Sequence, residues 1–378
     1  MKVYLDNAAT TPIDKEVLKE MMPLLENNFG NPSSIHSFGR ISRSIVEAAR
    51  KNVSKHLRCS PGEIFFTSGG TEADNMAIRC GMIDLGINHA ITSRIEHNAV
   101  LHPLEEMSSK GLIKLSYVNL DEKGNVDLFH LEKLLKSNNR SFISLMHANN
   151  EIGNLLDIMT VGEMCKTYNA IFHSDTVQTM SHYTFNLSEL PIHFITGAAH
   201  KFHGPKGVGF SFVRKNSGLN PFILGGSQER GLRAGTESVH NIVGMSKALE
   251  LAYKNLEDES KYIRKLKKYA ILKINELIPE SHFNGNCDKD DKSAYNLINV
   301  NLPISSEKKD LLDFQLDLKG IACSKGSACQ SGSDQGSHVL EIVVPENLKN
   351  RPSLRFSFSS FNSKDEIDFL IKTIREFI

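Results

Sequence analysis

The sequence carries no excess of either charge. Its 378 residues include 44 Lys and Arg and 44 Asp and Glu, so the formal net charge is zero. A chain without net positive charge lacks the long-range field that draws a protein to nucleic acid or to an anionic membrane. We therefore expect neither a direct nucleic-acid partner nor a membrane partner, apart from what a local basic patch could bind.

Long apolar runs are absent as well. No stretch approaches the roughly 18 consecutive apolar residues that a membrane-spanning helix needs, and the first residues, MKVYLDNAATT, turn polar almost at once. The six cysteines include no C-x-x-C pair, and a chain of this length does not need disulfides to hold its core together. These absences predict a protein that is neither secreted nor inserted, with reduced thiols and a cytoplasmic location.

What the sequence does contain is typical of a soluble, folded protein. Hydrophobic residues make up 40% and charged residues 23%, which excludes collagenous, disordered and coiled-coil classes, and the length suits two domains. After two expected helices, at 14–28 and 38–57, short apolar runs alternate with helical stretches. The runs lie at 64–67, 89–92, 113–118, 142–147 and 171–174. This alternation predicts a parallel sheet with helices on both faces.

A different pattern begins after this region. The run 208–213 is an expected strand, and the amphipathic stretch 236–277 is an expected long helix that links the large domain to the C-terminal region. The remaining expected elements are strands near 295–301 and 353–358 and helices near 307–319 and 363–378. They predict a smaller α+β domain at the C-terminal end.

The segment FFTSGGTEAD at 65–74 passes from a strand through two glycines into a helix. Free N–H groups at a helix N-terminus, here with the hydroxyl of Thr71, form a cradle that suits a phosphate. The segment has neither the G-x-G-x-x-G spacing of a dinucleotide site nor the G-K-[ST] ending of a nucleoside triphosphatase loop. A Gly-Gly turn before a helix is also common without any ligand.

Two further clusters lie at expected strand ends. Asp175 follows an apolar strand, where it is placed either to hold a protonated heterocyclic nitrogen or simply to cap the next helix. Lys201 lies in an apolar, glycine-rich turn, and loss of hydration lowers the pKa of such an amine and equips it to form a Schiff base. The alternatives are a surface loop, or a metal site from His200 and His203 that lacks a clear third ligand. We expect no metal.

Cys329 differs from the other cysteines in its surroundings. Eight of the fourteen residues from 324 to 337 are Gly or Ser, a composition that predicts a flexible loop with an accessible thiol. Cys323 is expected to pack at a strand end. The cysteines expected to be structural, because they lie in apolar or helical settings, are Cys59, Cys80 and Cys165.

A phosphate cradle, a strand-end aspartate, a Schiff-base lysine and a mobile thiol occur together in one chain. The chain resembles the pyridoxal-phosphate-dependent cysteine desulfurases of the NifS/IscS type, in the class V aminotransferase-like superfamily. Further matching segments, in the same order, are YLDNAATT at 4–11, GNPSS at 30–34, NNEIG at 149–153 and QERGLRAGTE at 228–237. The resemblance implies the aspartate aminotransferase type of fold. It implies a large domain at 14–250 and a small domain at 1–13 and 251–378 that carries the loop 324–337.

The resemblance also implies a pyridoxal 5′-phosphate cofactor and a role for each matching residue. Lys201 would hold the cofactor as a Schiff base and then move the Cα proton of the substrate. Asp175 would keep the pyridine nitrogen protonated, and His97 would stack on the ring. The other implied contacts are Asn150 and Gln178 to the phenolic oxygen, and Gly70, Thr71, His200 and the Thr236 of a second subunit to the phosphate. That last contact implies a homodimer.

The implied reaction converts L-cysteine to L-alanine. Arg355 would bind the substrate carboxylate with help from Asn7, and Cys329 would take the sulfur as a persulfide. Either His97 or Lys325 would activate this thiol. The long loop favours the branch of the family that feeds acceptor proteins, and the implied acceptors are an iron-sulfur scaffold protein or a tRNA-thiolation protein.

One position departs from the family pattern. Ala198 stands where these enzymes usually carry a serine that bonds the phosphate, and the lost bond costs about 1.5 to 3 kcal/mol unless a water or Thr196 replaces it. Two other functions compete with desulfuration. One is selenocysteine lysis or another class V reaction, and the other is a catalytically silent scaffold that binds partner proteins. The joint presence of Lys201, Asp175, His97, Arg355 and Cys329 weighs against the scaffold.

Overall fold

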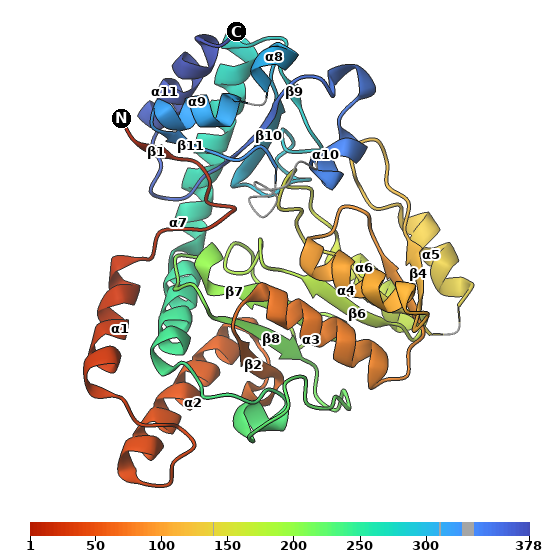
Figure 1. Cartoon of the computed structure of the whole chain (residues 1–378), viewed down its shortest axis with the longest axis vertical. Helices are drawn as coiled ribbons and strands as arrows, with labels where there is room; N and C mark the ends of the chain where they lie inside the picture. Colours follow the sequence, from red (N-terminus) through yellow and green to blue (C-terminus); the bar gives the residue numbers. More distant parts are fainter. Residues whose placement is uncertain (139, 310, 327–335) are drawn as a thin grey trace.

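The computed structural model describes residues 1–378 except 139, 310 and 327–335. A large sheet with its helices occupies one end of the molecule, and a smaller group of strands and helices occupies the other (Figure 1). The helix α7 (Val239–Leu277) runs along both parts, as the sequence predicts for a long linking helix.

The large sheet has seven strands in the described part of the chain, in the order β2-β8-β7-β6-β5-β3-β4. The strands are β2 (Ile64–Thr67), β3 (His89–Thr92), β4 (Lys114–Tyr117), β5 (Phe142–Ser144), β6 (Ile171–Asp175), β7 (Phe194–Ala198) and β8 (Gly209–Val213). β8 runs antiparallel to β2 and β7, and the other neighbouring pairs are parallel. The predicted α/β fold class with a mainly parallel sheet is confirmed.

β7 is a central strand that the sequence patterns do not predict. Its sequence, Phe-Ile-Thr-Gly-Ala, contains a glycine, and glycine weakens the strand signal. In the structure Gly197 faces a phenylalanine of β8, and a Cβ at position 197 would lie only 2.3 Å from Phe210 Cε1. The glycine is therefore required by the close approach of this ring, and tertiary packing overrides its low strand propensity.

Helices cover both faces of the large sheet. They are α1 (Lys15–Asn27), α2 (Ser37–Leu57), α3 (Gly70–Ile83), α4 (Asn98–Ser109), α5 (Leu128–Lys136) and α6 (Ile158–Thr167). Phe65 and Phe66, adjacent on β2, belong to two different apolar clusters because successive strand residues point to opposite faces. α3 and α4 pack in one cluster, and α2, α6 and the first part of α7 pack in the other.

The smaller group of elements contains two short sheets. The antiparallel strands are β12 (Ser353–Ser357), β10 (Leu297–Asn301) and β9 (His282–Phe283), and the parallel pair is β1 (Val3–Tyr4) with β11 (Ile321–Ala322). The helices are α8 (Ser306–Lys309), α9 (Leu312–Leu318), α10 (His338–Val343) and α11 (Lys364–Arg375). The predicted mixture of strands and helices in this region agrees with the structure.

Buried apolar residues divide along α7. Its residues up to Leu249 belong to a cluster with the large sheet, and those from Ile263 onward belong to a cluster with β10, β12 and α11. Val3 and Leu5 belong to this second cluster, although they open the chain. We propose on this basis that the small domain comprises 1–13 and 251–378 and that the large domain comprises 14–250.

The N-terminal segment crosses from the small group to the large sheet. Leu5 O accepts the N–H of Ser357 on β12 at 2.8 Å, and Thr11 N–H donates to His200 O at 2.9 Å. Residues 5–11 are thus bonded to both parts of the molecule. Two of them, Ala8 and Ala9, line a cavity between these anchors.

Candidate active site

A cavity of about 160 Å³ lies at the carboxyl ends of β6 and β7, where parallel α/β sheets bind ligands. Nine predicted site residues line it: Gly70, Thr71, His97, Asn150, Asp175, Gln178, His200, Lys201 and Arg355. Its other lining residues are Ala8, Ala9, Asp74, Met146, Val177 and Ala198. The structure therefore brings residues from distant parts of the chain to one place.

Lys201 ends a short 3₁₀ turn, Ala199–Lys201, between β7 and β8. Its Nζ donates to Ala8 O at 2.6 Å and to Ala9 O at 2.9 Å. Both acceptors belong to the N-terminal segment. Hydrogen bonds to these two carbonyl groups hold the amine at the cavity wall.

Asp175 is the last residue of β6 and is 6% exposed. Its Oδ1 accepts the N–H of Val177 at 2.9 Å. Burial raises the pKa of this carboxyl to about 6, the carboxylate of Asp74 acts in the same direction, and His97 opposes them. A buried carboxylate short of positive charge is suited to pair with a protonated ring nitrogen.

His97 caps the N-terminus of α4. Its Nδ1 accepts the N–H of Ala99 at 3.1 Å, so a neutral ring carries its proton on Nε2. Burial is the largest cause that lowers the pKa of His97, and Lys201 adds to it. The cavity wall therefore presents a neutral, flat imidazole at pH 7.

The predicted phosphate cradle is the first turn of α3, which begins at Gly70. A Cβ at this position would lie 2.8 Å from Val177 Cγ2, so a glycine keeps the backbone N–H groups close to the cavity. His200 stands near Thr10, with 3.2 Å between Nδ1 and Oγ1, and burial lowers the pKa of His200 to about 4. A neutral histidine and free N–H groups are a donor set that fits a phosphate.

Ala198 lines the cavity beside this cradle. Thr196 does not present its hydroxyl there: a Cβ on Gly70 would meet the Thr196 methyl at 3.8 Å, while Thr196 Oγ1 lies 3.3 Å from His173 Nε2. The suggestion that Thr196 replaces the missing serine hydroxyl is therefore wrong in this structure. The threonine belongs to a buried network under the sheet end.

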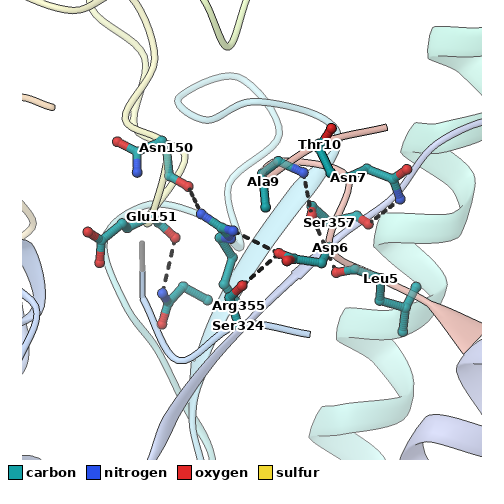
Figure 2. A network of polar contacts seen from close by, with 12 residues as sticks. Leu5, Asp6, Asn7, Ala9, Thr10, Asn150, Glu151, Ser324, Arg355 and Ser357 are labelled. Atoms are coloured by element: carbon teal, nitrogen blue, oxygen red, sulfur yellow. Dashed lines mark hydrogen bonds and ion pairs between the residues drawn. The ribbon is translucent and has the colours of Figure 1, made fainter. Parts of the chain in front are cut away.

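Arg355 on β12 is 1% exposed and reaches the cavity from the small group of elements. Its Nη1 donates to Asn150 O and its Nη2 to Asp6 Oδ1, both at 2.8 Å (Figure 2). Among the described residues its Nε has no hydrogen-bond partner. A buried cation at a cavity wall, with N–H groups beyond those bonded to Asn150 and Asp6, is a suitable receptor for a carboxylate.

Asn7 stands differently from its expected place beside Arg355. Its Nδ2 donates to Ser357 O at 2.8 Å and to Asn362 Oδ1 at 3.2 Å. The neighbour that contacts the guanidinium is Asp6, which sequence reasoning missed. The only sequence signal for Asp6 was its place in the segment 4–11.

The remaining predicted residues are Cys329, Thr236 and Lys325. Cys329 lies outside the described residues. Thr236 is exposed, and its expected contact is with a second chain. Lys325, one of the two groups expected to activate Cys329, has its Nζ 2.7 Å from Asp313 Oδ1.

Burial distinguishes the other cysteines from a reactive thiol. It raises the pKa of Cys59, Cys80, Cys165 and Cys323 to about 12 and that of Cys287 to about 11. Such thiols stay protonated at neutral pH and are poor nucleophiles. The structural role predicted for the first three agrees with their surroundings.

Within the described ranges, no group of three or more His, Cys, Asp or Glu side chains is arranged to bind a metal ion. His203, suggested as one ligand of an alternative metal site, has its Nδ1 2.9 Å from Pro12 O. No helix in this part of the chain has the length and apolar character needed to cross a bilayer.

The fold and the cavity together define a pyridoxal-phosphate enzyme. The chain belongs to the class-V aminotransferase family, whose match covers residues 3–370, and the enzymes of this family use pyridoxal 5′-phosphate. A relative named cysteine desulfurase IscS, from Dictyoglomus turgidum, is 40% identical over 380 residues, which cover all of this chain and 94% of the relative. The resemblance to NifS/IscS-type enzymes is confirmed.

Solved structures agree with this family. A NifS-like protein superposes with a TM-score of 0.90 at 36% identity, covering all of this chain and 99% of that one. A structure described as SspA in complex with cysteine gives a TM-score of 0.81 at 29% identity, covering 96% of this chain and all of that one. Both likenesses extend over nearly the whole chain.

The donor set of the cavity fits pyridoxal phosphate. Asp175 is a buried carboxylate for the ring nitrogen, and Lys201 is an amine for the aldehyde. The glycine-lined start of α3 is open to the phosphate. Asp175, Lys201 and Gly70 line the same cavity, as a single bound cofactor molecule requires.

Asp74 on α3 is a second buried carboxyl at the cavity, 1% exposed, with its Oδ1 3.3 Å from His173 Nε2. Burial raises the pKa of Asp74 to about 7, and it lowers the pKa of His173 to about 4, so the two groups do not form an ion pair at neutral pH. The folded protein thus binds a proton at Asp74 that the unfolded chain, in which this carboxyl has its ordinary pKa of 3.8, releases.

The raised pKa of Asp74 predicts how the free energy of unfolding depends on pH. A carboxyl group whose pKa is higher in the folded than in the unfolded protein stabilises the fold fully at a pH below its unfolded-state pKa. This stabilisation is lost as the pH rises through its folded-state pKa. Between pH 5 and pH 8 the cofactor-free parent should lose about 3 kcal/mol through this group, and Asp74→Asn should not. Urea unfolding at several pH values measures the difference. Asp258→Asn, at an exposed position on α7, is the control, and a parallel profile for Asp74→Asn would contradict the assignment.

Ala198 makes a second prediction. Ala198→Ser restores a hydroxyl beside the phosphate cradle, and a hydrogen bond to a charged acceptor contributes about 1.5 to 3 kcal/mol. We expect pyridoxal phosphate to bind at least tenfold more tightly, as measured by titration of the cofactor-free protein. Thr196→Val is the matched control and should leave this affinity within twofold. If Thr196→Val weakened binding strongly, the hydroxyl of Thr196 would be the compensating group after all.

Proposed function

We propose that this protein is a pyridoxal-phosphate-dependent cysteine desulfurase that converts L-cysteine to L-alanine and passes the sulfur to an acceptor protein. One observation carries the proposal. The Lys201 amine, the Asp175 carboxyl and the Arg355 guanidinium face one cavity, in a chain that is alike over its whole length to relatives named cysteine desulfurase.

The residues of the cavity divide the work. The bound cofactor supplies an electron sink for the bond between Cα and its hydrogen. Asp175 keeps the ring nitrogen protonated, which maintains that sink. Arg355 binds the substrate carboxylate and so orients Cα, and Lys201 takes the Cα proton and later returns a proton to the product.

The sulfur step belongs to Cys329. Its thiolate attacks the substrate sulfur, an S–S bond forms, and the C–S bond breaks with its electron pair left on the carbon side. Protonation of that carbon gives L-alanine, and the enzyme keeps a persulfide. The ammonium of Lys325 is already paired with Asp313 at 2.7 Å, which weakens its pull on a thiolate. This favours His97, neutral and on the cavity wall, as the activating base.

The proposed enzyme is a homodimer in which Thr236 of one subunit reaches the phosphate bound by the other. An exposed apolar surface runs along α1 and the start of α2, and large exposed apolar patches mark interfaces. Its members are Leu18, Met22, Leu25, Phe29, Ile35, Phe38 and Ile41. Phe29 and Ile35 are 79% and 89% exposed, and contact with a second subunit would remove these large apolar side chains from water.

The proposed acceptor is an iron-sulfur scaffold protein or a thiolation protein, and the proposed location is the cytoplasm. The alternative substrate is L-selenocysteine, which has the same carboxylate and amine for Arg355 and Lys201. Supplying the two amino acids separately and quantifying alanine decides between them.

The first test concerns the lysine. Purified protein should absorb in the near-visible, and borohydride should trap the cofactor on a peptide containing Lys201. Lys201→Ala should lose the trapped adduct and reduce alanine formation at least a thousandfold, because Lys201 is the only lysine among the described residues that line the cavity. Lys206→Ala changes an exposed lysine of the same segment and should behave as the parent. An adduct on another lysine would refute the assignment.

The second test concerns the thiol. Cys329→Ser should keep the cofactor absorbance and its change on adding L-cysteine, yet form no persulfide and release no more than about 1% of the parent's alanine, because hydroxyl oxygen cannot accept the sulfur. Mass spectrometry of the Cys329 peptide measures the persulfide. Cys323→Ser is the control and should retain it. Release of alanine and sulfide by Cys329→Ser at the parent rate would exclude Cys329 as the nucleophile.

A further inference from the structure

Asp6 is placed opposite Arg355 by backbone pairing. The N-terminal segment runs beside β12, where Leu5 O accepts the N–H of Ser357 and Ala8 N–H donates to Ser357 Oγ, both at 2.8 Å. Residues 355 and 357 share one face of their strand because side chains alternate. Asp6 therefore meets the guanidinium from a fixed stretch of backbone.

The Asp6 carboxylate is tied at two points. Oδ1 accepts from Arg355 Nη2 and from Ser324 Oγ, both at 2.8 Å (Figure 2). On the other side of the guanidinium, Nη1 donates to Asn150 O. Two of the three guanidinium nitrogens are thus held by groups of the protein, while Nε has no such partner in the described part of the chain.

This arrangement has an electrostatic reason. A guanidinium that is 1% exposed needs a counter-charge before a substrate arrives. Asp6, 16% exposed, supplies it and at the same time selects one of the many rotamers of a long side chain. Arg355 lines the cavity, and each of its Nη atoms keeps a second N–H beyond the one bonded to Asn150 or Asp6.

We propose that Asp6 is a positioning residue, which holds Arg355 in the orientation that binds the carboxylate of the substrate. This inference rests on the proposed function, since it presumes an α-amino acid at the cavity. An opposite role is conceivable on the same contacts, in which Asp6 occupies the place of the substrate carboxylate and competes with it. The two roles predict opposite signs for one measurement.

The experiment compares two ligands of the holoenzyme. L-alanine carries the carboxylate, and L-alaninamide replaces it by a neutral amide. Absorbance of the bound cofactor reports the dissociation constant of each. For Asp6→Asn we expect the constant for L-alanine to rise at least tenfold and that for L-alaninamide to stay within twofold. A merely structural role would weaken both ligands alike.

Every other outcome overturns the proposal. Tighter binding of L-alanine would mean that Asp6 competes with the ligand. An unchanged dissociation constant would mean that Asp6 does not affect binding of the carboxylate. Equally weakened binding of both ligands would mean that Asp6 has a structural role. Ser324→Ala removes the second bond to the same oxygen and should change L-alanine binding less than threefold. An effect as large as that of Asp6→Asn would assign the orientation to the serine.

Two further arms keep the result interpretable. If Asp6→Asn fails to retain the cofactor, Asp6→Glu keeps the charge, moves it by one methylene, and should show the same selective loss. In an Arg355→Lys background, Asp6→Asn should change the ratio of the two constants less than twofold. Alanine formation from L-cysteine by the parent tests the proposed function by itself. A parent that forms alanine, with an unaltered ratio in Asp6→Asn, would sink the inference alone.

Discussion

The site depends on the hydrogen bonds that residues 5–11 make to both parts of the molecule. Leu5 and Ala8 bond to Ser357 of β12, and Thr11 bonds to His200 next to the cofactor lysine. Between these anchors the carbonyls of Ala8 and Ala9 hold the Lys201 amine. This N-terminal segment therefore helps to position the Lys201 amine against β12. Its role is to position the amine, because the acceptors are the carbonyl groups of Ala8 and Ala9 in this connecting segment.

Buried charge is the second constraint. Asp175, Asp74 and Glu96 all lie within a few residues of the cavity, and burial raises the pKa of each, to about 6, 7 and 8. Ionising all three at once is costly in a medium of low dielectric. A protonated pyridine ring offers the positive charge that Asp175 lacks, so cofactor binding and ionisation of this carboxyl favour each other. An ionised Asp74 opposes that ionisation, whereas the pH dependence of stability that Asp74 brings comes from its own burial.

Local patterns predicted the parts of the structure that local forces decide. Apolar alternation located β2 to β6 and β8, and amphipathic spacing located α2 and α7. Strand-end position and glycine-rich context marked Asp175, Lys201 and the turn at Gly70 as candidates, and the family resemblance assigned their roles; the structure places all three at one cavity. β7 was not predicted because Gly197 is required by its contact with the ring of Phe210, and a contact between two strands is not visible in the local sequence. Prediction from pattern thus succeeds where the residues that determine a local structure are close to it in the sequence.

Long-range contacts explain the other failures. Asp6 and Arg355 are 349 positions apart and meet because strand pairing brings the chain's start beside β12. An isolated aspartate in a polar segment gives no sign of such a partner. The family motif suggested Asn7 for this place, one residue away. The chain turns directly after Asp6, where Ala9 N–H donates to Asp6 O at 3.0 Å, so the Asn7 side chain bonds to Ser357 and Asn362 and not to Arg355.

Residues 6 to 9 also bring the hydrogen-bond partners of the two functional groups within three peptide units of each other. The amine is held by carbonyls at 8 and 9, and the guanidinium by the carboxylate at 6. α7 joins the same two parts through 39 residues, and any bending of a long helix would shift one part against the other. A link of three peptide units has few conformations to lose. The contacts to residues 6, 8 and 9 therefore restrain the separation of the amine and the guanidinium.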